Sequence, residues 1–111
     1  MSNLRNRVQL IGNAGNDPEV QTLESGRKLT KFSIATNDSY RNDKGERITN
    51  TEWHNIVAWG KTAEIIGEYV TKGKEVAIDG KLTTRSWEDG DGNKRYITEV
   101  ICNEILLLGG K

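Results

Sequence analysis

The chain has little of several features that anchor or cross-link proteins: it holds one cysteine and one proline in 111 residues. A single thiol, Cys102, excludes an internal disulfide framework and any metal site built from several cysteines. No apolar run is long enough for a membrane span or for a signal peptide. These absences predict a cytoplasmic protein, and the sequence indicates neither a metal site nor a cofactor.

Net charge is also lacking, because sixteen basic residues balance sixteen acidic ones and the isoelectric point is about 6.6. Such a chain exerts no overall attraction on nucleic acid, so nucleic-acid binding would require basic residues segregated on one surface. With only 34% apolar residues, the 111-residue chain is expected to form one domain, residues 1–111, around a modest core.

The stretch Thr51–Lys61, TEWHNIVAWGK, contains two of the three tryptophans, Trp53 and Trp59. Side chains of a strand alternate between faces, so this even spacing places both rings on one face. The same face carries Asn55 and Val57, and the other carries His54, Ile56 and Ala58. The Ile56 side suits a core, so we expect the tryptophans to face outward. Large outward rings are unusual unless something stacks on them.

Two segments before this stretch alternate with period two, as half-buried strands do. Asn6–Asn13 places Val8 and Leu10 on one side, and Glu19–Leu23 is expected to continue that strand beyond the turn at Pro18. Lys28–Thr36 is a second strand, with Phe32 and Ile34 facing inward. The polar residues Asn37–Asn50 are expected to form a long hairpin loop.

The period changes after Gly60, where Ala63, Ile66, Tyr69 and Val70 recur at helical spacing. Lys72-Gly73 is a suitable C-terminal stop, so the sequence predicts one short amphipathic helix.

Period two returns in Glu75–Trp87, and Lys94–Leu108 is the last predicted strand. The expected inward side chains of Glu75–Trp87 are Val76, Ile78 and Leu82, and the outward ones are Lys81, Thr83, Arg85 and Trp87. Gly80 suggests a bulge, and Asp89-Gly90-Asp91-Gly92 is a hairpin signal.

Three strands, a helix and two strands is the element order of an all-β OB fold, a five-stranded Greek-key barrel with one short helix between strands 3 and 4. A two-layer α+β sandwich remains an alternative from the element order alone.

Aromatic and basic residues alternate along the candidate surface. The rings are Tyr40, Trp53, Trp59 and Trp87, and the neighbouring cations are Arg41, Lys61 and Arg85. Rings on a strand platform bind any base, because every base has a π face, and cations follow the phosphates. The competing interpretation is that the tryptophans belong to the core.

Two other groups are candidates for catalysis. His54 and Cys102 would need adjacent side chains and an orienting group, and no signature supports this, so packing roles are favoured. The acidic residues Glu52, Asp79 and Glu99 show no metal or acid–base spacing, and solvated charge on a strand face explains them. We therefore predict no catalytic residue, and a small hydrolase using these carboxylates is the enzyme alternative.

The chain resembles the bacterial single-stranded DNA-binding proteins. The resemblance is carried by NRVQLIGNAGNDPEV (Asn6–Val20), FSIATNDSYR (Phe32–Arg41), TEWHNIVAWGK (Thr51–Lys61), EYVTKGKEVAIDGKLTTRSW (Glu68–Trp87) and RYITEVICNEILLLG (Arg95–Gly109). It implies an OB fold, a homotetramer built as a dimer of dimers, and sequence-independent protection of single-stranded DNA in replication, repair and recombination.

The resemblance also implies roles for single residues. Base stacking is expected at Tyr40, Trp53, Trp59 and Trp87, and phosphate contacts are expected from Lys61, Lys72 and Arg85. Asn55 and Arg41 join the expected DNA-binding residues because of their places beside these rings. Subunit contacts are expected at Asn6, Val8, Leu10 and His54. The family often has tryptophan at the position of Tyr40 and phenylalanine at that of Trp59, and both departures keep a ring.

The family commonly continues into a flexible linker and an acidic tip that recruits replication and repair proteins. The printed sequence ends at Lys111 without that tip, so the resemblance does not extend to such recruitment. A module for single-stranded RNA, or a primosome-type module, is the alternative within the binding class.

Overall fold

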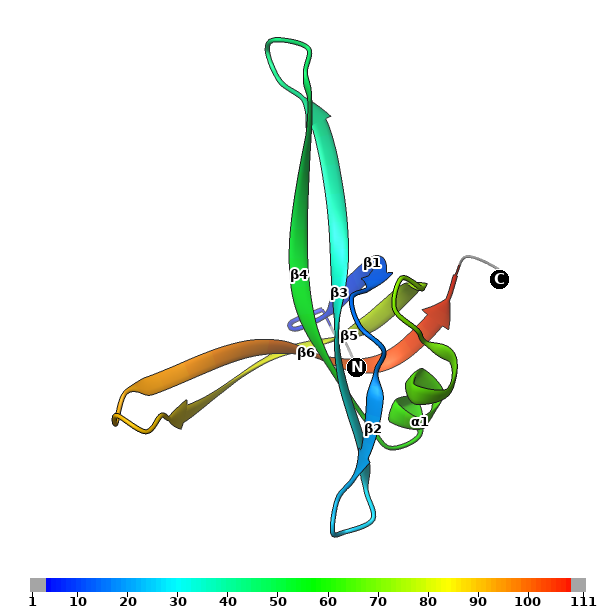
Figure 1. Cartoon of the computed structure of the whole chain (residues 1–111), viewed down its shortest axis with the longest axis vertical. Helices are drawn as coiled ribbons and strands as arrows, with labels where there is room; N and C mark the ends of the chain where they lie inside the picture. Colours follow the sequence, from blue (N-terminus) through cyan, green and yellow to red (C-terminus); the bar gives the residue numbers. More distant parts are fainter. Residues whose placement is uncertain (1–3, 109–111) are drawn as a thin grey trace.

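The structure is a computed structural model that describes residues 4–108; residues 1–3 and 109–111 of the predicted domain lie outside the described part. The elements in chain order are β1 (Val8–Ala14), β2 (Glu19–Thr22), β3 (Lys28–Arg41), β4 (Arg47–Trp59), α1 (Gly60–Tyr69), β5 (Glu75–Glu88) and β6 (Lys94–Leu107) (Figure 1).

The strands form one sheet that closes on itself. Its order is β1-β5-β6-β4-β3-β2, and β1 also pairs with β3 through Asn13–Ala35 and Ala14–Ile34. Five strands, β1, β3, β4, β5 and β6, thus make a closed barrel with the helix between β4 and β5, which confirms the predicted architecture. The predicted continuation of the first strand is a separate strand, because the chain turns before β2 and β2 pairs only with β3.

The barrel interior is filled by side chains from every barrel strand and from α1. Phe32 and Ile34 are buried there as predicted, and Ile66 of the helix is fully buried beside them. Tyr69 was predicted on the buried face of the helix, but it is 55% exposed. The helix buries only Ala63 and Ile66, with Val70 buried just after its end, and Tyr69 falls outside this stripe.

The predicted loop Asn37–Asn50 is wrong, because β3 and β4 pair continuously from Leu29–Trp59 to Arg41–Arg47. This long ribbon rises out of the barrel in Figure 1, so both of its faces meet solvent. It therefore lacks the apolar alternation by which a strand is recognised in a sequence. Only the turn between the two strands is a loop, and Asn42 Oδ1 accepts the backbone N–H groups of Lys44 and Glu46 there.

The β5–β6 hairpin forms a second arm, and the β2–β3 hairpin forms a shorter extension (Figure 1). The radius of gyration is 16.3 Å. A compact domain of this length has about 13 Å. The excess follows from the arms, whose surfaces are open on both sides.

The predicted bulge at Gly80 is confirmed. Asp79 pairs with Glu104 and Gly80 pairs with Cys102, which leaves Asn103 of β6 as the extra residue. A Cβ atom at Gly80 would lie 2.0 Å from the carbonyl oxygen of Ile101, so no side chain fits there.

Leu82 was predicted to face the core, but it is 48% exposed. The pairing of β1 with β5 ends at Val8–Gly80, so at Leu82 β5 is paired only with β6, through Val100, and its other edge has no strand beside it. The side chain of Asn6 instead completes the edge, because it donates to the carbonyl and accepts from the N–H of Leu82, both at 2.9 Å.

Candidate nucleic-acid interface

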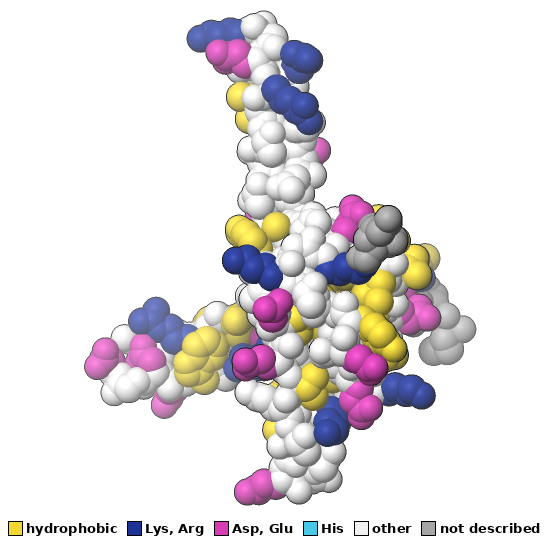
Figure 2. All heavy atoms as spheres, turned by 45° about the vertical axis from the view of Figure 1, so that its right-hand side comes forward, with side chains coloured by type: hydrophobic (Ala, Val, Ile, Leu, Met, Phe, Trp, Pro, Cys, Tyr) yellow, Lys and Arg dark blue, Asp and Glu magenta, His cyan; other side chains and the backbone are white. Residues whose placement is uncertain are grey.

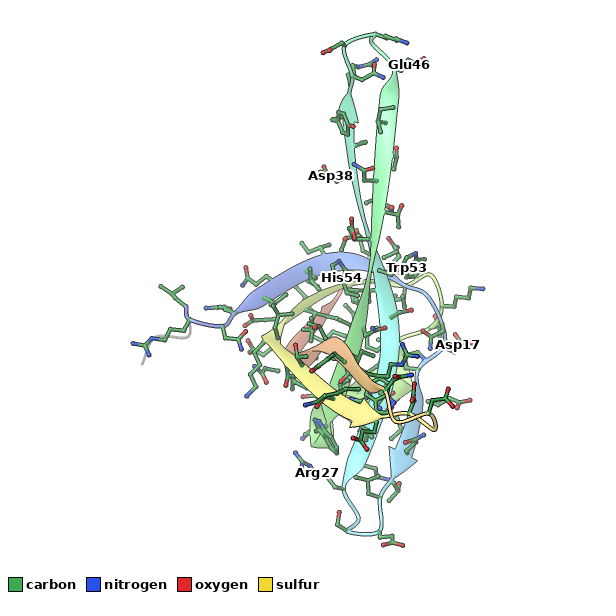
Figure 3. The ribbon with its side chains drawn as sticks, turned by 90° about the vertical axis from the view of Figure 1, so that its left-hand side faces the viewer. Asp17, Arg27, Asp38, Glu46, Trp53 and His54 are labelled. Atoms are coloured by element: carbon green, nitrogen blue, oxygen red, sulfur yellow. The ribbon has the colours of Figure 1, made fainter. Side chains whose placement is uncertain are left out.

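Trp53 lies on the outer face of β4 at the point where the long ribbon leaves the barrel (Figure 3). Its side chain is 62% exposed, and a Cβ atom added to Gly15 would meet its ring at 2.6 Å. The absence of a side chain at Gly15 therefore lets the β1–β2 connection support the indole. One part of the ring rests on backbone while most of it remains open to a ligand.

Val57, predicted on the same outward face, is only 4% exposed. At this level β4 is an inner strand between β3 and β6, pairing with Lys31 on one side and Ile101 on the other. The side chains of these two cross-strand partners flank Val57 on the outward face and reduce its exposure. The outward face becomes open at Asn55 and Trp53, nearer the ribbon.

Trp59 is half-buried at the last pair of β4, and its ring is already stacked. The guanidinium carbon of Arg27 lies 4.3 Å from the ring centroid, a distance typical of a cation–π contact. Figure 3 shows Arg27 near the β2–β3 turn, away from Trp53. Sequence reasoning missed Arg27, because its place beside Trp59 depends on a strand register that local patterns do not reveal.

Trp87 lies on the β5–β6 arm and is 44% exposed. The guanidinium of Arg85 lies 5.6 Å from its ring centroid and also forms an ion pair with Glu99, with Nε–Oε1 at 3.0 Å. Arg85 therefore links an exposed ring to a carboxylate that the barrel holds.

Glu99 was predicted to be a solvated charge, but it is 5% exposed. Its two oxygens accept from Nε and Nη2 of Arg85, so the buried carboxylate has a bidentate partner. Asp79 is likewise paired, with Arg7 at 3.1 Å. Each carboxylate thus has its own arginine, which argues against the paired-carboxylate site of the enzyme alternative.

A shallow groove joins several of the predicted residues across the outer face of the barrel. Its lining includes Asn16, Lys31, Ser33, Asn55, Arg85 and Glu99. Asn16 is fixed there because its Oδ1 accepts both the N–H and the hydroxyl of Ser33. Sequence reasoning missed Asn16 and Lys31; the only signal for Lys31 was its outward parity on the second strand.

Tyr40 and Arg41 lie at the far end of the β3–β4 ribbon. Tyr40 is 52% exposed and pairs with Ile48, so strand parity places it on the face opposite Trp53. The Nη1 group of Arg41 donates to the carbonyl of Gly45 at 2.9 Å. The structure therefore does not bring Tyr40 onto the platform that holds Trp53.

Lys61 and Lys72 flank the helix, and both are exposed. Lys61 is in the first turn of α1, whereas Lys72 follows the helix and donates its backbone N–H to Asp17 at 2.7 Å. Neither lysine lines the groove of Asn55 and Arg85.

The residues predicted for subunit contacts are placed mainly by contacts within the chain. Val8 and Leu10 are partly buried against the core, and Asn6 holds the β5 edge. His54 is half-buried and shares a hydrogen bond of 2.9 Å with the hydroxyl of Thr36.

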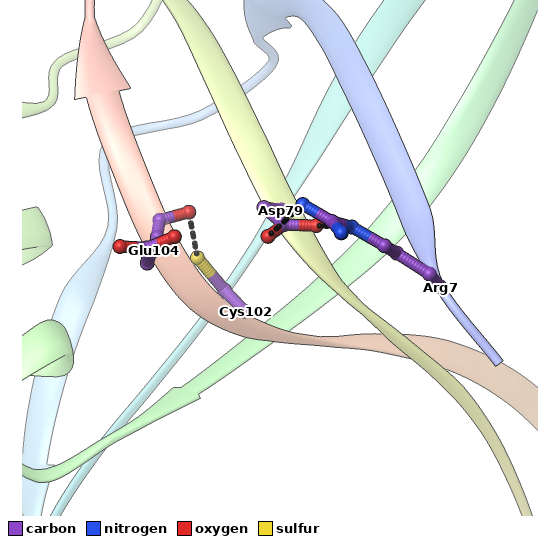
Figure 4. Close-up of polar contacts among 4 residues, drawn as sticks. All are labelled: Arg7, Asp79, Cys102 and Glu104. Atoms are coloured by element: carbon purple, nitrogen blue, oxygen red, sulfur yellow. Dashed lines mark hydrogen bonds and ion pairs between the residues drawn. The ribbon is translucent and has the colours of Figure 1, made fainter. Parts of the chain in front are cut away.

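Cys102 is buried and its thiol donates to the carbonyl of Glu104 at 3.3 Å (Figure 4). Burial, reinforced by the negative charge of Asp79, raises the pKa of this thiol to about 11. A thiol that keeps its proton is a poor nucleophile, and the histidine is engaged with Thr36. Within residues 4–108, no group of three or more His, Cys, Asp or Glu side chains could hold a metal ion. In the same range, no helix is long and apolar enough to cross a membrane.

These observations define a class of protein first. A closed five-stranded barrel with a helix between its third and fourth strands is an OB fold, and exposed rings beside a polar groove on its outer face are the features of an oligonucleotide platform.

The particular family follows from comparison with known proteins. The family model described as "Single-strand binding protein family" matches residues 5–108, and the chain belongs to this family. A protein named "Single-stranded DNA-binding protein 1" from Chlorobaculum tepidum is 46% identical over 107 residues. The match covers 96% of this chain and 66% of that relative. A protein of the same name from Xylella fastidiosa is 42% identical, with 96% of this chain and 79% of that relative covered.

Two solved structures are similar in fold. One, the Plasmodium falciparum SSB in complex with single-stranded DNA, has a TM-score of 0.85 and 35% identity, covering 94% of this chain and 95% of that one. The other, a deletion mutant of the single-stranded DNA binding protein from Thermus aquaticus, has a TM-score of 0.82 and 27% identity, covering 96% and 51%. The chain thus spans about half of the Thermus chain and 66% of the Chlorobaculum relative.

Proposed function

We propose that this chain binds single-stranded DNA without sequence preference and protects it during replication, repair and recombination. The observation that carries the proposal is Trp53, whose indole is 62% exposed yet supported by Gly15 on a strand platform. A large ring held open in this way serves as a stacking surface for any base. Family membership and the relatives' names support the choice of DNA as the ligand.

Stacking is proposed to extend from Trp53 to Trp59, Trp87 and Tyr40, each in a different setting. Trp87 is open beside Arg85, whereas a base on Trp59 has to share the ring with Arg27 or replace it. Tyr40 is proposed to stack on a base of the bound DNA after that DNA has passed to the opposite face of the β3–β4 ribbon. Phosphate contacts are assigned to Arg41, Lys61, Lys72 and Arg85, with Lys31 of the groove added from the structure.

The assembly proposed is a homotetramer formed as a dimer of dimers. Residues 8–12 of β1 pair only with β5, so the outer edge of this strand is free to pair with a second copy. A second surface runs across β1, β5 and β6, where the register aligns Ile11, Ala77 and Leu106 in one row. Ile11 and Leu106 are 61% and 63% exposed. Exposed apolar side chains in a row are typical of an interface.

The experiment that tests the proposed function is a titration of the intrinsic tryptophan fluorescence with a mixed-sequence DNA oligonucleotide. Stacked bases contact the indoles directly, so we expect saturable quenching that weakens as salt is added. The RNA oligonucleotide of the same sequence is the control, and tighter binding of RNA would favour the RNA module. No quenching by either strand would contradict the proposal.

A further inference from the structure

The last pair of the β3–β4 ladder brings two arginines face to face, Arg41 and Arg47. Like charges directly opposite each other destabilise a strand pair. In residues 4–108 the arginines in ion pairs are Arg7, Arg85 and Arg95, so neither Arg41 nor Arg47 forms an ion pair there. Figure 2 shows several basic side chains, with acidic ones among them, at this end of the ribbon.

The two arginines are held in position by other bonds. Arg41 donates to the Gly45 carbonyl at 2.9 Å, and Arg47 donates through Nη2 to the hydroxyl of Ser39 at 3.4 Å. Together with Tyr40, these residues line a small surface pocket. The ribbon thus keeps two exposed arginines of like charge at one cross-strand pair, where both line the same pocket.

This pair lies on the face that carries the proposed platform. Residues of one parity on β4 run from Trp53 through Thr51 and Thr49 to Arg47, and their partners on β3 are Ala35, Asn37, Ser39 and Arg41. The surface between is polar, and the hydroxyl of Thr51 donates to Asn37 Oδ1 at 2.7 Å. Six residues of strand span about 20 Å. A flexible ligand leaving Trp53 along the ribbon would therefore reach the arginines, although the twist of the ribbon rotates this face.

We infer that Arg41 and Arg47 form a clamp for a backbone phosphate of the bound strand, with Arg47 as a contact residue that sequence reasoning did not identify. The inference rests on the proposed function and deepens it. Guanidinium groups present paired donors that match phosphate oxygens, and two of them can enclose one phosphate. The phosphate also removes the repulsion between the arginines, so binding strengthens the end of the ribbon.

The test measures the affinity of Arg47→Ala for oligo-dT of two lengths by fluorescence titration. A strand of about four nucleotides, the lower end of OB-fold site sizes, fits the groove at Trp53, whereas about sixteen nucleotides can reach the clamp. We expect about fivefold weaker binding of the longer strand only, as for the loss of an exposed ion pair. Its slope of log K against log salt should fall by about 0.7. Lys44→Ala, which removes the same charge from the turn, is the matched control.

A second readout separates the clamp from a structural role. Removal of Arg47 relieves the repulsion in the free protein, so amide hydrogen exchange in the ribbon should slow while affinity falls. Faster exchange in Arg47→Ala, or equal losses of affinity in Arg47→Ala and Lys44→Ala, would overturn the clamp while leaving the proposed function intact. If the unmodified protein binds neither strand, the proposed function fails and the clamp fails with it.

Discussion

The three tryptophans differ in what already occupies their rings, and this difference determines how each can bind. Trp53 has backbone beneath part of its ring, Trp59 is covered by Arg27, and Trp87 lies beside the ion-paired Arg85. Of the three, Trp53 is the most open. It is therefore the residue at which stacking and packing can be separated most cleanly.

Replacing Trp53 by alanine should weaken DNA binding by about 1–3 kcal/mol, the usual value for one stacked base. The loss of stability should be much smaller than the 3–5 kcal/mol, roughly, that truncation of a buried aromatic costs. Ile56→Ala is the control on the opposite face of β4, where the side chain is fully buried. It should lower the melting temperature and leave the affinity of the folded fraction unchanged. The reverse pattern in calorimetry and titration would contradict the assignment of the two faces.

Arg85→Ala should reduce both binding and stability, because it leaves the carboxylate of Glu99, 5% exposed, without its partner. An unsatisfied buried group costs about 1–3 kcal/mol, towards the low end here since Arg85 is half exposed. Adding Glu99→Gln to Arg85→Ala should restore stability but not affinity. Denaturant unfolding measures the first effect and DNA titration the second. Recovery of affinity in the double variant would show that Arg85 acts only through Glu99.

The buried thiol of Cys102 should make the protein lose stability at alkaline pH. Its pKa is about 11 in the folded chain and 9.0 when unperturbed, so the folded state keeps a proton that the unfolded state releases. The contribution of this thiol to the free energy of unfolding is complete below pH 9. It is lost as pH rises towards 11, by up to about 2–3 kcal/mol for a two-unit shift. The Cys102→Ala variant is expected to be less stable at neutral pH, and its stability should not show this part of the fall at alkaline pH. Parallel pH profiles from urea unfolding of the two proteins would contradict the effect.

At the scale of elements, the sequence predicted strands well wherever one face meets the core. Lys94–Leu108 differs from β6 by one residue, and Phe32 and Ile34 lie inward as expected. The prediction failed where elements leave the barrel. The ribbon beyond Thr36 has no apolar face. Leu82 has the alternation of an inward residue, but it lies at an edge that leaves its side chain exposed. The period of apolar residues reflects the burial of one face, so it does not reveal a strand that is exposed on both sides.

The turn of the β5–β6 arm depends on Asp89, which should make the arm sensitive to acid. Its Oδ2 accepts from Arg95 at 2.9 Å, and its Oδ1 accepts the N–H groups of Asp91 and Asn93. The bond from Arg95, followed by that from the Asn93 N–H, lowers the pKa of Asp89 below 3.8. Stability from this group is therefore present above that pH and is lost as pH falls below it.

Amide exchange in the arm, followed by NMR, should accelerate as pH is lowered through this range, beyond its intrinsic pH dependence. Asp89→Asn keeps an oxygen acceptor for the backbone but loses the charge that holds Arg95, so its exchange should already be faster and should depend less on acid. Asp91→Asn removes a carboxylate of the same turn while keeping the three bonds to Asp89, and it serves as the control. If both substitutions change amide exchange equally, the faster exchange in acid results from the total charge of the turn and not from Asp89 in particular.

At the scale of the whole molecule, the site was predictable in its residue types but not in its layout. The rings were found from parity and composition, yet the Arg27 contact, the Glu99 pair and the opposite placement of Tyr40 all depend on long-range register. Balanced total charge conceals local differences: within residues 4–108 Arg41 and Arg47 form no ion pair, whereas Asp79 and Glu99 are each paired with an arginine. The amino-acid composition does not show which charged side chains pair or how far apart they lie.

The proposed tetramer gives the last prediction. Ile11→Glu places a charge at the β1 end of the exposed row on β1, β5 and β6, and burying an unpaired charge there would cost more than the interface gains. Light scattering at micromolar concentration should then report two chains instead of four, because the free edge of β1 still pairs. Tyr96→Glu, a charge at a 64% exposed ring on the β5–β6 arm, should leave the mass at four chains. A single chain for the unmodified protein would refute the assembly, and an Ile11→Glu tetramer would place its second interface elsewhere on the barrel.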